Sequence, residues 1–491
     1  MDRIDILPKD EVNVKIECDR GLAQELSDYF TFEVPGAKFM PSYKNRMWDG
    51  KVRLFNTASH TLYKGLVTRV KKFCQDRDYE CVVQGGLNDI NDISCNELEE
   101  FLKGKYTPRD YQLRAVAHAL RHNRALILSP TASGKSFIIY CILKYLLSHE
   151  CKKALLIVPT TSLVYQMNTD FIEYSENLQF YYTHLIMEGQ EKNNDEAHIF
   201  ISTWQSIYKQ PKKWFDQFDV VIGDEAHQFK ATSLTKIMTK LDQCKYRFGL
   251  TGTLDGTQTN KLVLEGLFGP VMKVIQTKEL IDSGTLSAFR IKALVLKYPD
   301  PICKQQKKNT YQEEIAFLIS NEYRNKFIQN LALTREGNTL ILFQMVDKHG
   351  QILYNNLIEK TKDDRKVFFV HGGVDATDRE EIRSLTERES NAIIVASYGT
   401  FSTGINIRNL HNIIFASPSK SRIRNLQSIG RALRKGDNKE IATLYDISDD
   451  LSYKSWHNYT IKHFAERVKM YNEEEFDYKI YNIRVGYELD N

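Results

Sequence analysis

One short stretch of the sequence has the residue types and spacing of a phosphate-binding loop. It reads Ser-Pro-Thr-Ala-Ser-Gly-Lys-Ser over residues 129–136. In such a loop the backbone N–H groups point toward bound phosphate, and the positive end of the following helix favours the same anion. We expect Lys135 to reach the β- and γ-phosphates and the Ser136 hydroxyl to hold a magnesium ion. The residues expected to line the nucleotide are Pro130, Thr131, Ala132, Ser133, Gly134, Lys135 and Ser136.

The segments on either side of this loop are apolar. Residues 125–128 are short and wholly apolar, as a buried parallel strand would be, and residues 137–143 continue as a helix. Strand, loop and helix in this order are the context that a phosphate-binding loop requires. Ser129 stands where the general pattern prefers Gly, so a helix-capping loop without a nucleotide is the alternative.

A pair of carboxylates follows another apolar strand. Residues 220–222 lead into Gly-Asp-Glu-Ala-His at residues 223–227. The carboxyl end of such a strand lies at the ligand-binding edge of an α/β sheet, beside the phosphate loop. We expect Asp224 to hold magnesium, Glu225 to orient and polarise the attacking water, and His227 to relay between the nucleotide and a second lobe. Carboxylates at strand ends are commonly only solvated, but the upstream loop favours the catalytic role.

Apolar strands alternate with helical segments in two successive series, which is typical of parallel sheets with crossover helices. We therefore predict an α/β protein with a first lobe at residues 106–295 and a second at residues 310–450. Residues 451–491 are expected to form a helical tail that docks on the second lobe. The polar segment at residues 85–105 is the expected linker to the preceding domain.

Residues 1–100 are predicted to form a small α+β domain that binds nucleic acid. Between residues 38 and 72 there are nine basic residues and one acidic residue, Asp49, with aromatic residues interleaved. Basic side chains neutralise phosphates and aromatic rings stack on bases or enter a junction. The alternative is a solvated basic face with its aromatic residues in the core. The residues expected to bind nucleic acid are Lys44, Arg46, Trp48, Lys51 and Arg53.

The composition is that of an ordinary soluble protein. Of 491 residues, 26% are charged and 42% hydrophobic, and no apolar run approaches the roughly 18 residues of a membrane span. The N-terminus has no targeting pattern, and the eight cysteines show no metal-ligand spacing. We expect a monomeric cytoplasmic protein with reduced thiols and no membrane partner. The net charge of +4 predicts no partner by itself, so nucleic-acid binding must come from local clusters.

The combination of Asp-Glu-Ala-His with Ser-Gly-Lys-Ser resembles the superfamily 2 helicases and translocases, over residues 106 to about 450. This resemblance implies two tandem RecA-like lobes, ATP with Mg²⁺ as cofactors, and movement along nucleic acid. Arg109 and Gln112 in Arg-Asp-Tyr-Gln resemble the segment that recognises adenine. Residues 250–253, Leu-Thr-Gly-Thr, resemble the motif that couples hydrolysis to lobe movement.

Other strand-end motifs resemble the loops that family members lay along a nucleic-acid backbone. Small hydroxyl residues and backbone N–H groups contact phosphates without reading sequence, as a translocating motor requires. Gly404 is expected on the nucleotide side, and the neighbouring Asn406 stands where many members have Asp. The residues that this resemblance assigns to the backbone are Pro159, Thr160, Thr203, Gln205, His371, Gly372 and Thr400.

The segment Gln-Ser-Ile-Gly-Arg-Ala-Leu-Arg at residues 427–434 is similar to the arginine motif of the same family. Arg431 and Arg434 are one helical turn apart on one face. Closure of the lobes would let them reach the γ-phosphate and stabilise the charge of the transition state. Paired arginines at this spacing ordinarily lie on a surface helix, but the order of motifs along the chain favours the catalytic role.

Residues 41–54, followed directly by this motor, resemble the recombination and repair DNA helicases of T-even-like bacteriophages. That resemblance implies branched substrates, namely Holliday junctions, stalled forks and R-loops, or single-stranded DNA. Its expected protein partners are recombination or single-strand-binding proteins. The alternatives are an RNA helicase, a nucleic-acid clamp with an inactive motor, and the motor subunit of a restriction enzyme, although no nuclease motif is found.

Overall fold

The computed structural model describes residues 2–87, 90–176, 181–361, 365–374, 376–404, 407, 409–417, 419–435, 439 and 441–486. The chain divides into two compact units, Met1–Ile275 and Gln276–Asn491. No helix in these ranges is long and apolar enough to cross a membrane. All eight cysteines are free thiols.

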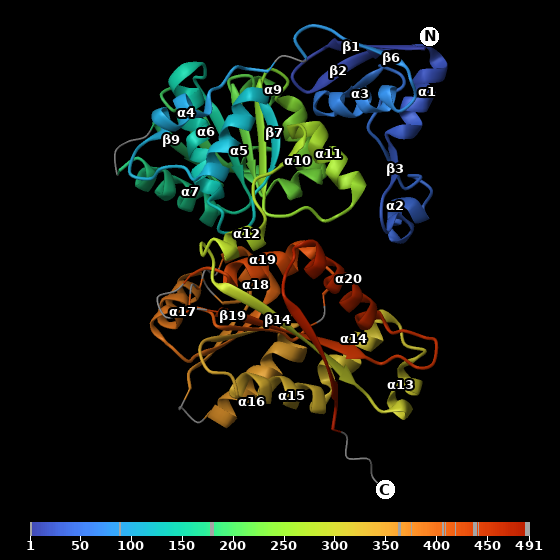
Figure 1. The fold of residues 1–491 in the computed structure, drawn as a ribbon, viewed down its shortest axis with the longest axis vertical. Coiled ribbons are helices and arrows are strands. Elements are labelled where there is room, and N and C mark those ends of the chain that lie inside the picture. The colour runs from blue at the N-terminus through green and yellow to red at the C-terminus, as the bar shows by residue number, and fades with distance from the viewer. Residues whose placement is uncertain are drawn as a thin grey trace. The chain divides into compact units, whose positions relative to one another are not determined.

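The first unit begins with a small domain built on a four-stranded mixed sheet. Its order is β5 (Thr61–Tyr63), β2 (Asn13–Glu17), β1 (Arg3–Pro8) and β6 (Glu80–Val83). Alternate strand residues are buried against α1 (Arg20–Tyr29) and α3 (Val67–Gln75), which lie beside this sheet in Figure 1. Each helix has its apolar residues on one side, so sheet and helices enclose one core.

A projection extends from this domain between α1 and β5. It consists of the antiparallel pair β3 (Thr31–Glu33) and β4 (Lys51–Arg53), with η1 (Ala37–Phe39) and α2 (Pro41–Lys44) between them. Figure 1 shows α2 at the far end of β3, away from the sheet. Lys51 and Arg53 are both exposed, so the two cations of this strand lie on the same face, while Val52 between them is half-buried.

The rest of the first unit is a lobe around a seven-stranded, wholly parallel sheet. Its order is β13 (Val271–Lys273), β7 (Arg124–Leu128), β12 (Tyr246–Thr251), β11 (Val220–Asp224), β8 (Ala154–Val158), β10 (Ile199–Thr203) and β9 (Thr183–Ile186). The central strands β12, β11 and β8 are buried along their whole length because helices cover both faces of a parallel sheet. The prediction of an α/β lobe is confirmed.

Helices connect the strands of this lobe. They are α5 (Asp110–His122), α6 (Lys135–His149), α7 (Thr161–Tyr174), α8 (Trp204–Ile207), α9 (Lys212–Phe215), η3 (Ala226–Lys230), α10 (Thr232–Lys240) and α11 (Gln258–Phe268). The expected linker at residues 85–105 is not extended throughout. It contains α4 (Cys95–Leu102), because Leu98 and Leu102 are buried beside α5 and α6.

The second unit holds another seven-stranded parallel sheet. Its order is β16 (Val367–Val370), β17 (Ile393–Ser397), β15 (Thr339–Phe343), β18 (Asn412–Phe415), β19 (Ile441–Asp450), β14 (Ala288–Lys297) and β20 (Tyr478–Arg484). The boundary predicted at residue 295 is wrong for β14. All ten of its residues pair with β19, so the strand belongs to this sheet.

The helices of the second unit are α12 (Thr277–Asp282), α13 (Asp300–Gln306), α14 (Tyr311–Ser320), α15 (Glu322–Leu333), η4 (Val346–Gly350), α16 (Gln351–Thr361), α17 (Ala376–Arg388), α18 (Tyr398–Gly404), α19 (Arg422–Ala432) and α20 (Tyr459–Glu473). The tail helix α20 docks through buried Arg467, whose Nε donates to Asp446 Oδ2 at 2.9 Å. After α20 the tail adds β20, which its polar sequence did not indicate.

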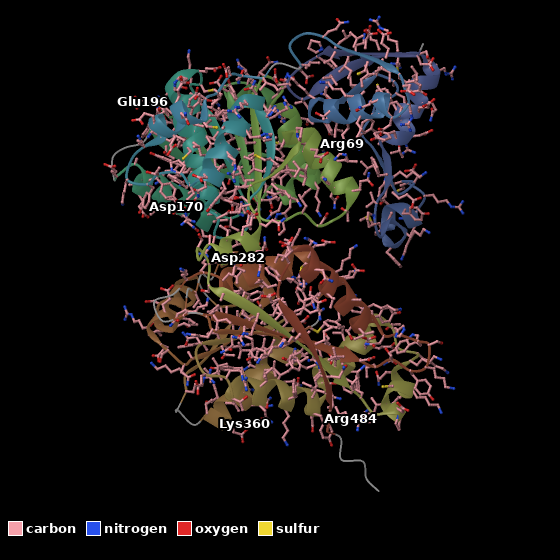
Figure 2. The ribbon with its side chains drawn as sticks, in the orientation of Figure 1. Arg69, Asp170, Glu196, Asp282, Lys360 and Arg484 are labelled. Carbon is pink, nitrogen blue, oxygen red and sulfur yellow. The ribbon has the colours of Figure 1, made fainter. Side chains whose placement is uncertain are left out.

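Helix α11 joins the small domain to the first lobe. Arg69, labelled in Figure 2, donates two hydrogen bonds of 2.9 Å to the buried carboxylate of Glu265 on α11. Leu262 of α11 belongs to the core of the small domain. Gly65 lies so close to α11 that a β-carbon there would collide with the Glu265 carbonyl and stand 2.7 Å from that of Gly266. The absent side chain therefore permits the contact.

We predict that Gly65→Ala destabilises the first unit by about 1–3 kcal/mol, the usual cost of overpacking, because the added methyl group has only backbone to displace. Thermal unfolding of the whole chain measures this loss. Gly104→Ala is the matched control, since no heavy atom lies within 4 Å of a β-carbon at Gly104. Equal melting temperatures for the two variants would contradict the close approach.

Candidate nucleotide and nucleic-acid sites

Three neighbouring strands of the first lobe end at the same edge of the sheet. The phosphate-binding loop follows β7, Asp224 ends β11, and Thr251 ends β12, which lies between them. All three strands are parallel, so their carboxyl ends bring these residues together. The edge expected from sequence to hold the nucleotide is therefore present.

A network of short polar contacts crosses this edge. Lys135 Nζ donates to Glu225 Oε1 at 2.9 Å. The other oxygen, Glu225 Oε2, lies 3.3 Å from His227 Nδ1 and accepts from Thr251 Oγ1 at 3.4 Å. Burial alone would raise the pKa of Glu225, but the Lys135 ammonium and His227 hold it well below its ordinary value. Glu225 is thus an ionised carboxylate at neutral pH.

Asp224 has the surroundings of a metal ligand. It is only 6% exposed, and its Oδ1 atom is buried without a hydrogen-bond partner in the described part of the chain. Burial raises the pKa of Asp224 to about 6, and the Glu225 charge adds to this rise against the opposing effect of Lys135. A buried carboxylate oxygen without a partner is costly unless a cation or donor satisfies it. Asp224 and the Ser136 hydroxyl fit magnesium, which takes few protein ligands and keeps several waters.

The phosphate-binding loop is held in a conformation that needs its glycine. Gly134 has φ +83°, and a β-carbon there would collide with Gln112 Nε2. Inside the loop, Ser129 Oγ and Ser133 Oγ lie 2.5 Å apart. Ser129, at the first position of the motif where Gly is usual, therefore stabilises the loop through a hydrogen bond within it.

Gln112 also fastens this loop. Its Nε2 donates to the Ser133 carbonyl at 2.9 Å, and its Oε1 accepts from the backbone N–H of Arg109 at 3.0 Å. Tyr111 OH donates to the same carbonyl of Ser133 at 3.2 Å. These contacts place the Arg109 to Gln112 segment against the loop, and the expected adenine contacts of Arg109 and Gln112 stay a prediction.

The structure adds Tyr174 to this site, which the sequence did not indicate. Its hydroxyl lies 2.8 Å from Ser136 Oγ. Its ring packs edge-on against Phe137 and Tyr140 of α6 and against Tyr106. Tyr174 can accept a hydrogen bond from the Ser136 hydroxyl, which leaves the lone pairs of that oxygen for a cation. The two residues are 38 positions apart, so no local pattern relates them.

The backbone-contact residues predicted in the first lobe end two neighbouring strands. Pro159 and Thr160 follow β8, and Thr203 ends β10 beside it. Thr203 is buried, with its Oγ1 3.1 Å from Ser206 Oγ, whereas Gln205 is exposed. The structure brings these residues to one edge, and their contact with nucleic acid stays a prediction.

The corresponding residues of the second unit also end neighbouring strands. His371 and Gly372 follow β16, and Thr400 lies in α18 after β17. His371 Nδ1 accepts from the N–H of Gly373 at 3.1 Å. Thr400 is buried and its hydroxyl lies 2.9 Å from Ser397 Oγ. Gly404 ends α18, while Ile405 and Asn406 lie outside the described residues.

Arg431 and Arg434 are not on one helix. Helix α19 ends at Ala432, so only Arg431 is helical, with its guanidinium carbon 5.8 Å from the centre of the Phe401 ring. The Arg434 carbonyl accepts from Lys439 Nζ at 2.9 Å and from Ser287 Oγ at 3.4 Å. These bonds hold the segment after α19, and the phosphate contacts of both arginines stay a prediction.

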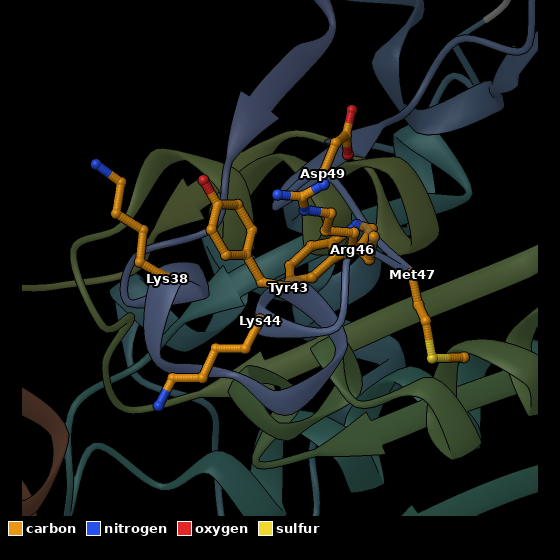
Figure 3. A pocket seen from close by; sticks show the side chains of 7 residues that line it. Lys38, Tyr43, Lys44, Arg46, Met47 and Asp49 are labelled. Atoms are coloured by element: carbon orange, nitrogen blue, oxygen red, sulfur yellow. The ribbon is translucent and has the colours of Figure 1, made fainter.

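The projection of the small domain has an open pocket of about 630 Å³. Figure 3 shows the side chains around it. The pocket is lined by Lys38, Tyr43, Lys44, Arg46, Met47, Trp48 and Asp49. Trp48 is held by its Nε1, which donates to the Lys51 carbonyl at 2.8 Å. Arg53 is paired with Asp49 at 2.5 Å, so part of its charge is already compensated.

Two apolar side chains stand out on this projection. Phe39 is 81% and Met47 82% exposed, beside the cations Lys38, Lys44 and Arg46. Among the large apolar side chains of the described residues, these two are the most exposed. The sequence did not indicate that Phe39 and Met47 would be exposed, because burial cannot be inferred from a short irregular segment.

Three sequence families match successive parts of the chain. Residues 3–84 match the family "DNA helicase UvsW, N-terminal". Residues 105–256 match "Type III restriction enzyme, res subunit", and residues 322–436 match "Helicase conserved C-terminal domain".

The chain is similar to known helicases over nearly its full length. It is 34% identical over 494 residues to the ATP-dependent DNA helicase uvsW of Enterobacteria phage T4, covering 95% of this chain and 96% of the phage protein. The crystal structure of T4 UvsW superposes with a TM-score of 0.52 at 33% identity, covering 99% of this chain and all of the other. A putative ATP-dependent RNA helicase of African swine fever virus is 26% identical over 66% of this chain and 64% of its own length. Because the chain is 34% identical to the phage T4 protein over nearly the full length of both, it belongs to the UvsW family of superfamily 2 helicases.

Proposed function

We propose that this protein is an ATP-dependent DNA helicase that remodels branched DNA in recombination, repair and replication. The observation that carries the motor activity is the Lys135–Glu225 pair beside buried Asp224 at the carboxyl edge of the first sheet. The observation that favours branched DNA is the projection with cations and two exposed apolar side chains. The relative in phage T4 is named as an ATP-dependent DNA helicase.

In the Lys135–Glu225 pair, bound phosphate can replace Glu225 as the partner of the Lys135 ammonium. When ATP enters, its β- and γ-phosphates compete with Glu225 for the Lys135 ammonium. Glu225 is then released to orient a water molecule for attack on the γ-phosphate, while Thr251 and His227 keep its other oxygen in place. Asp224 and Ser136 would hold Mg²⁺, which supplies charge stabilisation to the phosphates. Arg431 and Arg434 stabilise the developing charge when ATP draws the lobes together.

The projection suits a junction better than a plain duplex. Its cations Lys38, Lys44 and Arg46 can neutralise phosphates, which gives affinity without sequence preference. Phe39 and Met47 can cover bases that are unstacked at a branch point, as apolar wedges do at distorted base steps. Arg69 and α11 hold the small domain on the ATP-binding lobe, so the projection moves with the motor.

An RNA helicase is the second candidate, since the African swine fever virus relative is named as a putative ATP-dependent RNA helicase. Stimulation of ATP hydrolysis should be compared for forked DNA, four-way junctions, R-loops, plain duplex and single-stranded RNA. We expect the branched substrates to stimulate most. Stimulation by single-stranded RNA alone would favour the second candidate.

Lys135→Ala should reduce ATP turnover by at least about a hundredfold, because the ammonium that neutralises the phosphates is lost. Steady-state phosphate release measures turnover, and fluorescence anisotropy with a labelled fork should show DNA binding largely intact. The matched control is Lys152→Ala, an exposed lysine of the same lobe. Normal turnover in Lys135→Ala would contradict the assignment of the phosphate-binding loop.

Lys44→Gln with Arg46→Gln should weaken binding to branched DNA and reduce the slope of log Kd against log salt by about 1.8, or about 0.9 for each lost phosphate contact. Lys9→Gln with Arg20→Gln, two exposed cations elsewhere in the small domain, is the matched control. Adding Lys51→Gln and Arg53→Gln should lower affinity further, with the smaller share from Arg53 because Asp49 already pairs with it. An unchanged affinity and slope would mean that this surface is only solvated.

A further inference from the structure

A pocket in the second unit has features that the motor motifs do not use. It has a volume of about 410 Å³ and is lined by Tyr311, Gln344, Ser419, Lys420, Ser421, Arg424, Tyr459 and His463. Gln344 follows β15 and Ser419 comes soon after β18, so the pocket lies at the carboxyl edge of the sheet. Its aromatic wall comes from α14 and α20, outside the segments that resemble helicase motifs.

The cations of this pocket are not compensated by nearby acids. Lys420 and Arg424 form no ion pair with any carboxylate in the described part of the chain. Glu314 is close, but it is buried and accepts from the N–H groups of Tyr459 and Thr460 at 2.9 and 2.8 Å. The Glu314 carboxylate therefore accepts hydrogen bonds from the start of α20 and forms no ion pair with the pocket cations. The neighbouring pair Glu473 and Glu474 is bound by Arg422.

The aromatic wall is exposed and presents ring faces and edges. Tyr311 is 38% and Tyr459 40% exposed, and their ring centres lie 5.8 Å apart in an edge-on arrangement. The His463 ring lies 5.4 Å from that of Tyr311. Burial, with the charges of Lys420 and Arg467, lowers the pKa of His463, so its ring is neutral at neutral pH. Its buried Nδ1 has no hydrogen-bond partner among the described residues.

The pocket continues a row of strand ends that already carries predicted backbone contacts. The sheet order runs β16, β17, β15, β18, and His371 and Thr400 follow the first two strands. Adjacent strands lie about 4.8 Å apart, so the row from β16 to β18 spans about 14 Å, the length of a few nucleotides. A strand that crosses the ends of β16 and β17 would reach Lys420 and Arg424 next.

We propose that this pocket is an additional binding site for single-stranded nucleic acid, in which Lys420 and Arg424 hold a backbone phosphate and a base packs against Tyr311 and Tyr459. This inference rests on the proposed function, since it takes the partner of the pocket to be the strand on which the motor moves. Uncompensated cations beside exposed rings are the combination that binds single strands without reading their sequence.

The test uses the full chain and labelled oligothymidylate, with affinity measured by anisotropy over a range of salt concentrations. Lys420→Gln with Arg424→Gln should reduce the salt slope by about 0.7, the value for one lost phosphate contact to a single strand. Tyr311→Ala with Tyr459→Ala should lower affinity about tenfold, whereas Tyr311→Phe with Tyr459→Phe, which keeps both rings, should bind as the wild type does.

The matched controls are Lys304→Gln in α13 with Lys307→Gln directly after this helix, both exposed, and Tyr481→Ala on β20, where the tyrosine is 40% exposed. Photocrosslinking of bromouridine-substituted oligonucleotide to the wild-type chain needs no variant and should label the peptides of α14 or α20. Three results would overturn the proposed binding site. They are an unchanged affinity and salt slope in the pocket variants, losses of equal size in the control variants, and crosslinks confined to other peptides. A wild-type chain whose ATP hydrolysis no DNA stimulates would instead overturn the proposed function.

Discussion

The ion pair between Lys135 and Glu225 depends on the order of the parallel strands, and the chemistry of the first unit depends on that pair. Lys135 begins α6, which follows β7 and the phosphate-binding loop, and Glu225 directly follows β11. The two charges meet because β7 and β11 end at the same edge of the sheet. The Lys135 ammonium helps to hold the pKa of Glu225 below its ordinary value despite burial, so the carboxylate is ionised. Asp224, buried beside it, has an oxygen that remains for a cation.

A second constraint links the site to the small domain through α11. This helix follows the Thr251 motif at the end of β12 and carries Glu265, which binds Arg69. Below it, buried Arg247 donates to the carbonyls of Leu267, Leu241 and Met238 at 2.7 to 3.0 Å. Close packing of this kind transmits small displacements instead of absorbing them. The end of β12 at Thr251 is therefore linked to the small domain through the packed residues of α11.

The surfaces suited to nucleic acid are of two chemical kinds. Strand-end residues such as Thr160 and His371 offer small polar groups that can contact phosphates, which suits a motor that must not read sequence. The projection with Phe39 and the pocket with Tyr311 and Tyr459 instead combine cations with exposed apolar rings. Such rings can stack only on bases that are not already stacked in a duplex, which is the physical basis of the proposed preference for branch points and single strands.

The sequence alone determined the phosphate loop, the Asp224–Glu225 pair and the two α/β lobes, because each depends on a local pattern of apolar strands, glycine and charge. Only the tertiary structure showed the features that depend on contacts between residues far apart in the sequence. The Ser136–Tyr174 bond joins residues 38 positions apart, Arg69 and Glu265 are 196 apart, and β14 joins its sheet only through the distant β19. Periodicity reports which way a side chain faces, but not which distant segment it will meet, because that choice is made by packing of the whole chain.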